Sequence, residues 1–591
     1  MKWIKLKLLV IISIHLILIG GLSGKIMPAE NKSSRLGRDS SVASSGEDKF
    51  EKTVQSIIKK NKKQSDYEQI LDKQKPRVNG FVFDVLRETY RNPLKAAQIW
   101  EGKSDDISAV LANQEFSRFF ISLAAIVDIQ INYSAIEFPS VPSKEAGWPE
   151  HLSYLKNIFA KARDLVQDIH NASNFTACKG AENGMSARGA PMFGSAMPPE
   201  TKEKLFNSAI MMTVLLNRNY LGDLLNCLKN TKFEPVSVDV NTATGNILYL
   251  EETSFGRIII GGVGKNTYKQ DAVLLIDIGG DDTYLNNAGA TTENIAISWL
   301  VDFEGNDTYQ SEDNVAQGTG VCGVGYLLDL KGNDVYKASG QAQGCGIDGV
   351  GWLIDLAGND KYTGDSYNQG SAPNGIGLLT DFQGDDQYVS FLGAQGFGKS
   401  NGVGLLVDLA GNDAYKAGFK YLDPVVSRQQ GDPGATVSHS QGFGEYNGVG
   451  ILLELAGNDI YEVEYFGQGS GYKSFGFLRD FKGNDKYSGR RYTQGQGVHN
   501  AIGILIDDDG NDNYTNSKNA GQGAAFDHSL GILYDKKGKN VYSAGDSGDS
   551  QGAGLGLAFG FLIDLTGKTD SKGKSRPYDT ILEPGLGVAL K

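Results

Sequence analysis

QGFGKSNGVGLLVDLAGNDAY, at residues 395–415, is one copy of a pattern that recurs through the second half of the chain. The copies share the form QGxGxxxGxGxLxDxxGNDxY, and the acidic residue that precedes xxGND recurs every 25–29 residues, with one longer interval of 46. The longer interval contains an insertion near residues 419–439. Imperfect copies at both ends, GRIIIGGVGKNTY from Gly256 and GFLIDLTGKTD near the C-terminus, are typical of capping repeats.

The repeating unit is predicted to be β-structure, because its apolar segment is short, its turns are Gly-rich and it lacks helical spacing. A propeller blade needs about 40 residues, so a unit of this length fits one coil of a parallel β-helix instead. Equivalent residues of successive coils then lie about 4.8 Å apart. The Leu two positions before the acidic residue, such as Leu406, is constant and is expected to face inward, whereas its C-terminal neighbour varies (Thr380, Arg479, Tyr534) and is expected to face outward.

The Tyr that closes each copy, such as Tyr415, is expected to stack ring on ring along the coils. Packing in the core or at a corner of the coil is the favoured interpretation. An aromatic platform for sugars is the alternative.

Each copy also carries D-x-x-G-(N/D)-D, so that stacking brings carboxylates about 5 Å apart, where they repel. Two arrangements relieve the repulsion: a hard cation between coils, for which oxygen donors favour Ca²⁺, or capping of each Asx turn by its own backbone N–H groups. The sequence leaves both open. The candidate metal ligands are Asp277, Asp281, Asp282, Asp302, Asn306, Asp307, Asp329, Asn333, Asp334, Asp355, Asn359, Asp360, Asp381, Asp385, Asp386, Asp408, Asn412 and Asp413.

GGDDTY at residues 279–284 and the repeated GNDxY segments resemble the RTX family of calcium-binding nonapeptide repeats. In that family, Gly carbonyls and Asp carboxylates hold Ca²⁺ between turns of a parallel β-roll, so the resemblance implies Ca²⁺ at these turns. The match covers five or six residues per copy. The first two Gly residues of the family motif are replaced here, as by Asp355 and Leu356, and the period is about 26 rather than nine.

The first part of the chain is different. Lys2, Lys5 and Lys7 precede an apolar run at 8–19 that is too short to cross a bilayer, which predicts a signal peptide at 1–29, with an uncleaved anchor as the alternative. Residues 30–48 are polar and Ser-rich and are expected to form a flexible linker. Helical spacing from about residue 49, with prolines at helix starts, predicts a helical domain at 49–235, in which His151 and His170 are interpreted as helix-surface residues.

The chain is therefore predicted to be an α+β multidomain protein, with an N-terminal all-α domain followed at 250–591 by a parallel β-solenoid of about eleven 26-residue coils. The formal net charge of −13 divides into +6 for residues 1–250 and −19 for 251–591, and 62 of the 76 Gly lie in the second part. This acidic part argues against a nucleic-acid partner. No later segment predicts a membrane span once the signal peptide is removed.

Four cysteines suit an exported protein that does not depend on disulfides. Cys178 and Cys227 lie in the helical part, and Cys322 and Cys345 lie in the solenoid. Each pair could form one bridge, and buried thiols are the alternative; the sequence leaves both open.

No catalytic residues were identified in either part. The sequence predicts an exported structural or binding protein in the periplasm, at the cell surface or outside the cell, with Ca²⁺ as cofactor and polysaccharide or envelope components as partners. The alternative is a polysaccharide lyase or hydrolase on a β-helix scaffold, with its site at the breaks in the repeat. These breaks are the 419–439 insertion, residues 490–492 and residues 507–509, with His439 and His499 close by.

Overall fold

The computed structural model describes residues 49–170, 197–311, 314–423, 427, 432–545, 549–566, 570–572 and 586–590. The predicted signal peptide, the predicted linker and Cys178 lie outside these residues. The described helices precede all of the strands, as expected: α2 (Lys49–Lys60), α3 (Gln64–Gln74), η1 (Lys75–Gly80), α4 (Asp84–Arg91), η2 (Pro93–Lys95), α5 (Ala96–Ala112), α6 (Phe116–Ile126), η3 (Tyr133–Ala135), α7 (Trp148–Val166), α9 (Pro199–Met212), η5 (Thr213–Leu216) and α10 (Arg218–Asn230). In this part of the chain we found no helix with the length and apolar character needed to span a membrane.

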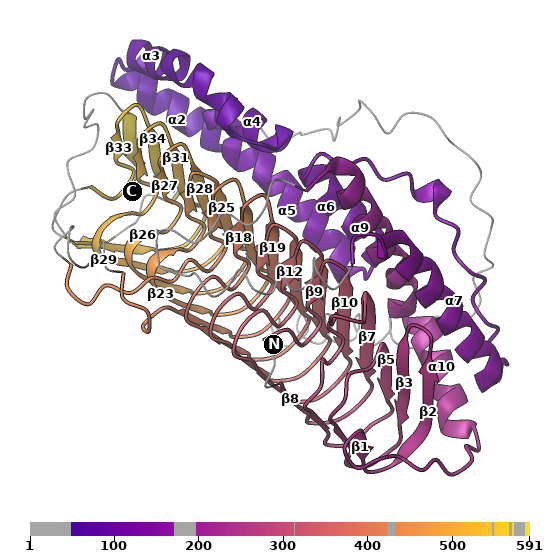
Figure 1. The fold of residues 1–591 in the computed structure, drawn as a ribbon. Coiled ribbons are helices and arrows are strands. Elements are labelled where there is room, and N and C mark those ends of the chain that lie inside the picture. Colours follow the sequence, from indigo (N-terminus) through magenta and orange to yellow (C-terminus); the bar gives the residue numbers. More distant parts are fainter. Residues whose placement is uncertain are drawn as a thin grey trace, which may run out of the picture. The chain divides into compact units, whose positions relative to one another are not determined.

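The strands form a parallel β-solenoid, which confirms the predicted fold class (Figure 1). The 14-stranded sheet, here called the helix-facing sheet, is β2 (Ile247–Thr253), β3 (Gly256–Gly261), β5 (Leu274–Asp277), β7 (Ile297–Asp302), β10 (Val324–Asp329), β13 (Val350–Asp355), β16 (Ile376–Asp381), β19 (Val403–Asp408), β22 (Val449–Glu454), β25 (Phe475–Asp480), β28 (Ile502–Asp507), β31 (Leu530–Asp535), β34 (Phe559–Asp564) and β36 (Leu586–Leu590).

The 13-stranded sheet, here called the Tyr sheet, is β1 (Ala243–Thr244), β4 (Thr267–Tyr268), β6 (Thr283–Tyr284), β8 (Thr308–Gln310), β11 (Val335–Lys337), β14 (Lys361–Thr363), β17 (Gln387–Ser390), β20 (Ala414–Ala417), β23 (Ile460–Gly467), β26 (Lys486–Thr493), β29 (Asn513–Gly521), β32 (Val541–Ala544) and β35 (Asp570–Lys572).

The third side of the coil is made of two-residue strands: β9 (Gly320–Val321) and β12 (Gly346–Ile347) as a pair, then β15 (Ala372–Pro373), β18 (Gly398–Lys399), β21 (Gly444–Glu445), β24 (Gly471–Tyr472), β27 (Gly497–Val498), β30 (Ala525–Phe526) and β33 (Gly554–Leu555), which form the seven-stranded third sheet.

The strand register stacks each copy of the motif on the next. Asp329 pairs with Asp355, 26 residues on, and Asp355 pairs with Asp381. The 46-residue interval keeps the same register, because Asp408 pairs with Glu454. The described residues of the insertion therefore lie outside the stacked strands, and the coils on either side keep the same register.

The interior of the coils is built from two side-chain ladders. The constant Leu residues, such as Leu353 and Leu379, and the closing Tyr residues form one fully buried cluster. Neighbouring rings stack, with 4.7 Å between the centroids of Tyr336 and Tyr362 and 3° between their planes. The inward Leu ladder and the packing role of the Tyr ladder are thus confirmed, and since these rings are buried they offer no platform to a sugar.

A third interior ladder was not predicted. The Gln that opens each copy has a left-handed backbone, as in Gln369 with φ 51°. Its amide Nε2 donates to the carbonyl oxygens of Tyr362 (3.0 Å) and of Val389 one coil further on (3.1 Å). Each Gln therefore ties two coils together, and these hydrogen bonds offset an unfavourable backbone conformation.

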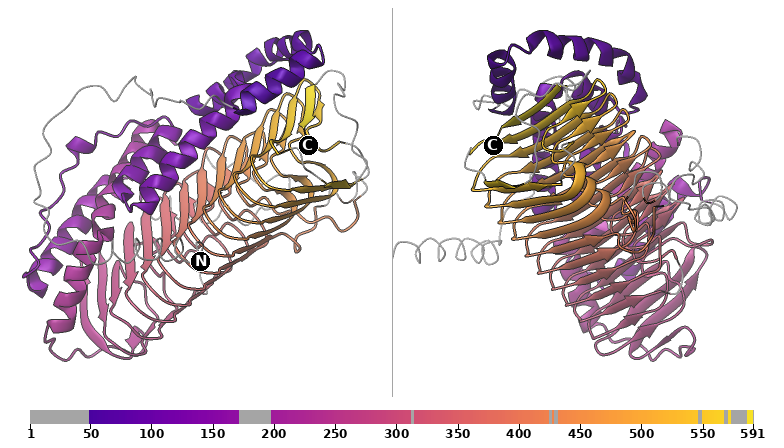
Figure 2. Two further views of the ribbon diagram at one scale, coloured as in Figure 1. Left: turned by 180° about the vertical axis from the view of Figure 1, so that it is seen from behind. Right: turned by 90° about the vertical axis from the view of Figure 1, so that its left-hand side faces the viewer.

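The helices lie along the helix-facing sheet (Figure 2). The outward side chains of this sheet are buried against them. Trp100 of α5 stacks on Phe475 at 3.9 Å, and the hydroxyl of Tyr326 donates to the carbonyl oxygen of Ala209 in α9 at 2.9 Å. Phe50 of α2 packs against Tyr534. Helices and solenoid thus share one hydrophobic core, and residues 48–591 form one compact unit.

The helices follow the solenoid in reverse order. The first described helix, α2, lies on the late strands β31 and β34, α5 lies on β25, and α9 lies on β10 and β13. Because the helices run from the last coils towards the first, the chain enters the solenoid at its N-terminal end after covering the length of one face.

The interpretation of His151 and His170 as helix-surface residues is wrong, since both are buried. His151 lies on the face of α7 that packs against α10, where its ring is 5.8 Å from that of Tyr220. Burial lowers the pKa of His151, because the charged form loses its hydration.

Cys227, Cys322 and Cys345 form no disulfide within the described residues. Gly346 pairs with Gly320, so Cys345 lies one coil above Thr319, three positions along the chain from Cys322. Cys322 and Cys345 therefore form no disulfide, because the strand register places them at different positions along their coils.

Candidate metal centre

The first Asp of each D-x-x-G-(N/D)-D segment ends a strand of the helix-facing sheet and caps the turn that follows. In Asp355, Oδ1 accepts the backbone N–H of Ala357 at 3.1 Å and Oδ2 accepts the hydroxyl of Tyr336 at 2.7 Å. The side chain is completely buried. The Asx-turn cap, one of the two arrangements that the sequence left open, is therefore present at this position.

The residue before the second Asp forms a separate, exposed ladder. The side-chain oxygen of Asn306 accepts the backbone N–H of Asn333 at 3.0 Å, and that of Asn333 accepts the N–H of Asn359 at 2.8 Å. The candidate ligands of this ladder are Asp281, Asn306, Asn333, Asn359, Asp385 and Asn412, and the structure keeps them apart from the buried carboxylates.

The second Asp is buried and only half satisfied. Oδ1 of Asp360 accepts the backbone N–H of Asp334 in the preceding coil at 2.6 Å. Its other oxygen, Oδ2, is buried and accepts no hydrogen bond from a donor group in the described residues, and it lies beside the Asp355 carboxylate, with which it can share a proton. The same orphaned oxygen recurs at Asp282, Asp307, Asp334, Asp360, Asp386, Asp413, Asp459, Asp485 and Asp512.

First and second Asp residues of adjoining coils converge. In Asp329, Asp334 and Asp355, one carboxylate oxygen from each residue lies within 4.8 Å of the others. Equivalent groups are Asp277–Asp282–Asp302, Asp302–Asp307–Asp329, Asp355–Asp360–Asp381 and Asp381–Asp386–Asp408. Each first Asp is shared by two groups, so the groups join into a continuous column, here called the carboxylate column.

The electrostatics of the carboxylate column are unfavourable for bare carboxylates. Burial, reinforced by the neighbouring carboxylate of Asp355, raises the pKa of Asp334 to about 8. The same causes raise the pKa of Asp360 to about 10. Without a counter-ion, such groups are neutralised by protons.

Asn takes the place of the second Asp at both ends of the carboxylate column. Asn266, in GKNTY, donates from Nδ2 to Asp277 Oδ2 at 2.9 Å. Asn540, in GKNVY, donates from Nδ2 to Asp564 Oδ2 at 3.3 Å, while its Oδ1 accepts the N–H of Asp512 at 2.9 Å. An amide at this position thus forms the same backbone hydrogen bond as Asp and also satisfies the neighbouring carboxylate.

The donor set fits a hard divalent cation. It consists of carboxylate oxygens, and each group includes an oxygen that is buried and unpartnered. The residues that would hold the cation are the first and second Asp of one coil and the first Asp of the next, as in Asp329, Asp334 and Asp355. Two carboxylates per coil equal the charge of one divalent ion.

Two of the three breaks in the repeat meet in the structure, because Arg490 contacts Asp432 of the 419–439 insertion, whereas residues 507–509 lie in a separate cluster. Arg490 pairs with Asp432 (3.0 Å) and Glu464 (3.2 Å) at the Tyr sheet. Asp508 instead pairs with Arg479 (2.8 Å) and with Lys536 under α5. A third cluster forms on the third sheet, where Lys399 pairs with Glu445 at 3.1 Å and His439 is 3.7 Å from Glu445.

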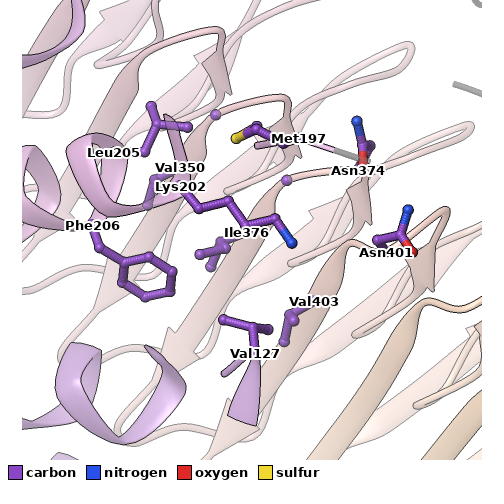
Figure 3. A pocket seen from close by; sticks show the side chains of 12 residues that line it. Val127, Met197, Lys202, Leu205, Phe206, Val350, Asn374, Ile376, Asn401 and Val403 are labelled. Carbon is purple, nitrogen blue, oxygen red and sulfur yellow. The ribbon is translucent and has the colours of Figure 1, made fainter. Parts of the chain in front are cut away.

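A small pocket, partly open to solvent, lies between α9 and the coils near β13, β16 and β19 (Figure 3). Its walls are mainly apolar, with Lys202, Asn374 and Asn401 as polar members. Burial lowers the pKa of Lys202. None of the carboxylate column lines this pocket, so the two features are independent.

Comparison with known proteins found no matching family model, no matching curated protein and no matching solved structure.

Proposed function

We propose that this chain is an exported structural or binding scaffold whose β-solenoid is stabilised by a column of Ca²⁺ ions in its carboxylate column. The observation that carries the proposal is the choice between Asp and Asn at the second Asp position. Asn266 and Asn540 complete their hydrogen bonds without any ligand, whereas nine coils between them carry Asp with a buried, unpartnered oxygen. A cation gives those oxygens a partner.

Charge balance supports a divalent ion. Each coil of the carboxylate column buries two carboxylates, which repel one another and the next pair along the axis. One divalent cation per coil makes the column neutral. Ca²⁺ suits a dry site better than Mg²⁺, because Mg²⁺ loses its water ligands reluctantly.

The scaffold role is supported by the regularity of the coils and by the ion pairs that the irregular residues form with one another. Arg490 meets Asp432 of the insertion, but in the described part of the chain Asp432 and Glu464 are both held in ion pairs with Arg490, and Asp508 lies in a separate cluster. These contacts favour a structural role for the breaks over the pair of catalytic carboxylates that a polysaccharide hydrolase would need. Export is proposed from the basic and apolar N-terminal segment, at residues 2–19. Outside the cell, such a column would take Ca²⁺ from the medium.

Thermal unfolding of the full chain in EDTA and in millimolar Ca²⁺ or Mg²⁺ tests the cation column. A ligand that binds only the folded state must raise the melting temperature, and about 100 Kd of ligand at one site adds about 2.7 kcal/mol. We expect Ca²⁺ to raise the midpoint strongly and Mg²⁺ to raise it less. A midpoint that is the same in EDTA and Ca²⁺ would falsify the proposal.

A pair of isosteric variants locates the effect. In Asp360→Asn, the new amide can donate to a neighbouring carboxylate, as Asn266 and Asn540 do. We expect this variant to melt at a higher temperature than the parent in EDTA at pH 8 and to gain less from Ca²⁺. The matched control is Asp385→Asn in the exposed ladder, whose neighbours Asn359 and Asn412 are already amides. If both variants respond to Ca²⁺ like the parent, the cation lies elsewhere.

A further inference from the structure

The third sheet ends each of its short strands in a turn whose first residue has a left-handed backbone. The φ angles are 47° for Tyr446, 50° for Lys473, 58° for His499 and 52° for Asp527. Gly556 occupies this position in the last coil. The equivalent turns of the earlier coils also hold non-Gly residues in this conformation, namely Cys322, Asp348, Asn374 and Ser400. The later coils differ in the size of the side chains that they carry there, at Tyr446, Lys473 and His499.

Aromatic rings in the same coils form a connected surface. The ring centroid of Tyr472 lies 5.7 Å from that of Tyr446, 5.5 Å from that of His499 and 6.0 Å from that of Phe466. Phe466 in turn stacks on Tyr492 at 4.8 Å, with 12° between the ring planes. We call this set, together with the half-buried Phe526, the aromatic face.

The aromatic face is confined to these coils. The strand register places Tyr472 in line with Glu445 and Lys399 and, further towards the N-terminus, with Pro373. In β9 and β12, the corresponding β-strand pair holds Val321 and Ile347. On the other side, Tyr472 is in line with the buried Val498, and Phe526 follows one coil further on. Aromatic side chains at this position therefore occur only in the later coils of the described third sheet, beside the turns of Tyr446, Lys473, His499 and Asp527.

The aromatic face is accessible and its charges balance. Tyr446 is 36% exposed, Tyr472 and Tyr492 are half-buried, and Lys473 is exposed. Lys473 Nζ lies 5.5 Å from the ring centroid of Tyr446, and His499 Nδ1 lies 2.7 Å from a carboxylate oxygen of Asp527. Flat rings are therefore edged by groups that donate and accept hydrogen bonds.

We infer that the aromatic face binds a neutral polysaccharide chain laid across successive coils. This inference rests on the scaffold function proposed above and supplies its binding surface. Tyr rings pack against the apolar faces of sugar rings while their hydroxyls and the neighbouring polar side chains bond to sugar hydroxyls. Charge favours a neutral chain over an anionic one, because Lys399 is paired with Glu445, Asp527 lies beside His499, and the solenoid as a whole is acidic.

Calorimetric titration of the full chain in Ca²⁺ with cellohexaose, laminarin, mannan and polygalacturonate tests the inference. We expect saturable binding of at least one of the three neutral glycans and none of polygalacturonate. In Tyr446→Ala/Tyr472→Ala, we expect binding to weaken at least about tenfold, as when a central aromatic contact is truncated. The matched control is Tyr133→Ala, a 42% exposed tyrosine in the helical part, which should bind like the parent.

Melting temperatures of the variants within a few degrees of the parent establish that both are folded. His499→Ala, which changes an exposed side chain, serves as a second probe should the double variant unfold. The inference is overturned if the parent binds none of the neutral glycans, if it prefers polygalacturonate, or if its binding survives both sets of substitutions. If Ca²⁺ stabilises the parent protein but the parent binds no glycan, only the glycan inference is wrong. If the parent binds a glycan but Ca²⁺ does not stabilise it, only the proposed cation column is wrong.

Discussion

Several residues of the repeat are constrained by their contacts with the neighbouring coil. The Gly of each GND segment approaches the carbonyl oxygen of the same Gly in the preceding coil. A Cβ built on Gly358 would lie 1.8 Å from the carbonyl oxygen of Gly332 and 2.6 Å from Oδ1 of Asp360. Glycine at this position therefore keeps the coils close enough for the carboxylate column to form.

We expect Gly358→Ala to destabilise the protein by about 1–3 kcal/mol, as overpacking of a rigid core does, because the obstacle is backbone rather than a flexible side chain. Denaturant unfolding of the full chain measures the change. The control is Gly102→Ala, on the exposed side of α5, where a Cβ meets no atom within 4 Å. That variant should gain about 0.5–1 kcal/mol, because Ala is the better helix former. Equal effects of the two substitutions would contradict this account of coil spacing.

At the scale of elements, the helices act as a cover for the helix-facing sheet. Its strands are buried on both faces, as parallel strands usually are. One face packs on the Leu and Tyr ladders, and the other packs on α2, α5, α6 and α9. The charged Arg479 on the outer face is buried together with hydrogen-bond partners. Its guanidinium group donates to Ser104 (2.7 Å) and Asp105 (2.8 Å) of α5.

Trp100 tests this docking of helix on sheet. It stacks on Phe475 and donates from Nε1 to Thr89 at 3.1 Å, and its side chain is buried. We expect Trp100→Ala to cost about 3–5 kcal/mol, the range for a large aromatic removed from a core. Hydrogen exchange followed by mass spectrometry should show faster exchange in β25 as well as in α5, with Tyr133→Ala as the silent control. Faster exchange limited to α5 would mean that helices and solenoid unfold separately.

For the whole molecule, the carboxylate column makes stability depend on pH and on cations together. Burial raises the pKa of Asp307 and Asp485 to about 7 and that of Asp334 to about 8. In the unfolded chain, an Asp titrates near 4. Because the folded protein holds these protons more tightly, their contribution to stability is complete below about pH 4 and is lost as pH rises through about 7–8.

We therefore expect the melting temperature in EDTA to fall as the pH is raised from 5 to 9. In Ca²⁺ the fall should be small, since the cation replaces the protons, and the gain from Ca²⁺ should grow with pH. Differential scanning calorimetry across this range measures both curves. Asp385→Asn should follow the parent, because Asp385 lies in the exposed ladder. A profile in EDTA that does not fall between pH 6 and 8 would show that the carboxylate column is not protonated in the cation-free protein.

Much of the solenoid fold could be predicted from the sequence, because the pattern that encodes it lies within a short motif and recurs in every coil. The alternation of Leu406 with the variable residue after it identifies an inner and an outer face, since side chains of a strand point to opposite sides. The D-x-x-G turn likewise identifies Asp408 as a cap, which bonds to the N–H of Ala410 at 3.1 Å. Of the candidate site, the sequence identified the carboxylates but grouped Asn306 and Asp385 with them, although these side chains point to solvent.

The sequence by itself determined the coil, its period and the stacking of acidic residues, because each depends on contacts between one copy of the motif and the next. Tertiary structure decided what covers the outer face, because Trp100 and Phe475 are far apart in the chain and no local pattern couples them. Tertiary structure also decided which carboxylates are buried and which are exposed. It further showed that Asn266 and Asn540 donate hydrogen bonds to the neighbouring carboxylates, which depends on the direction of their amide groups.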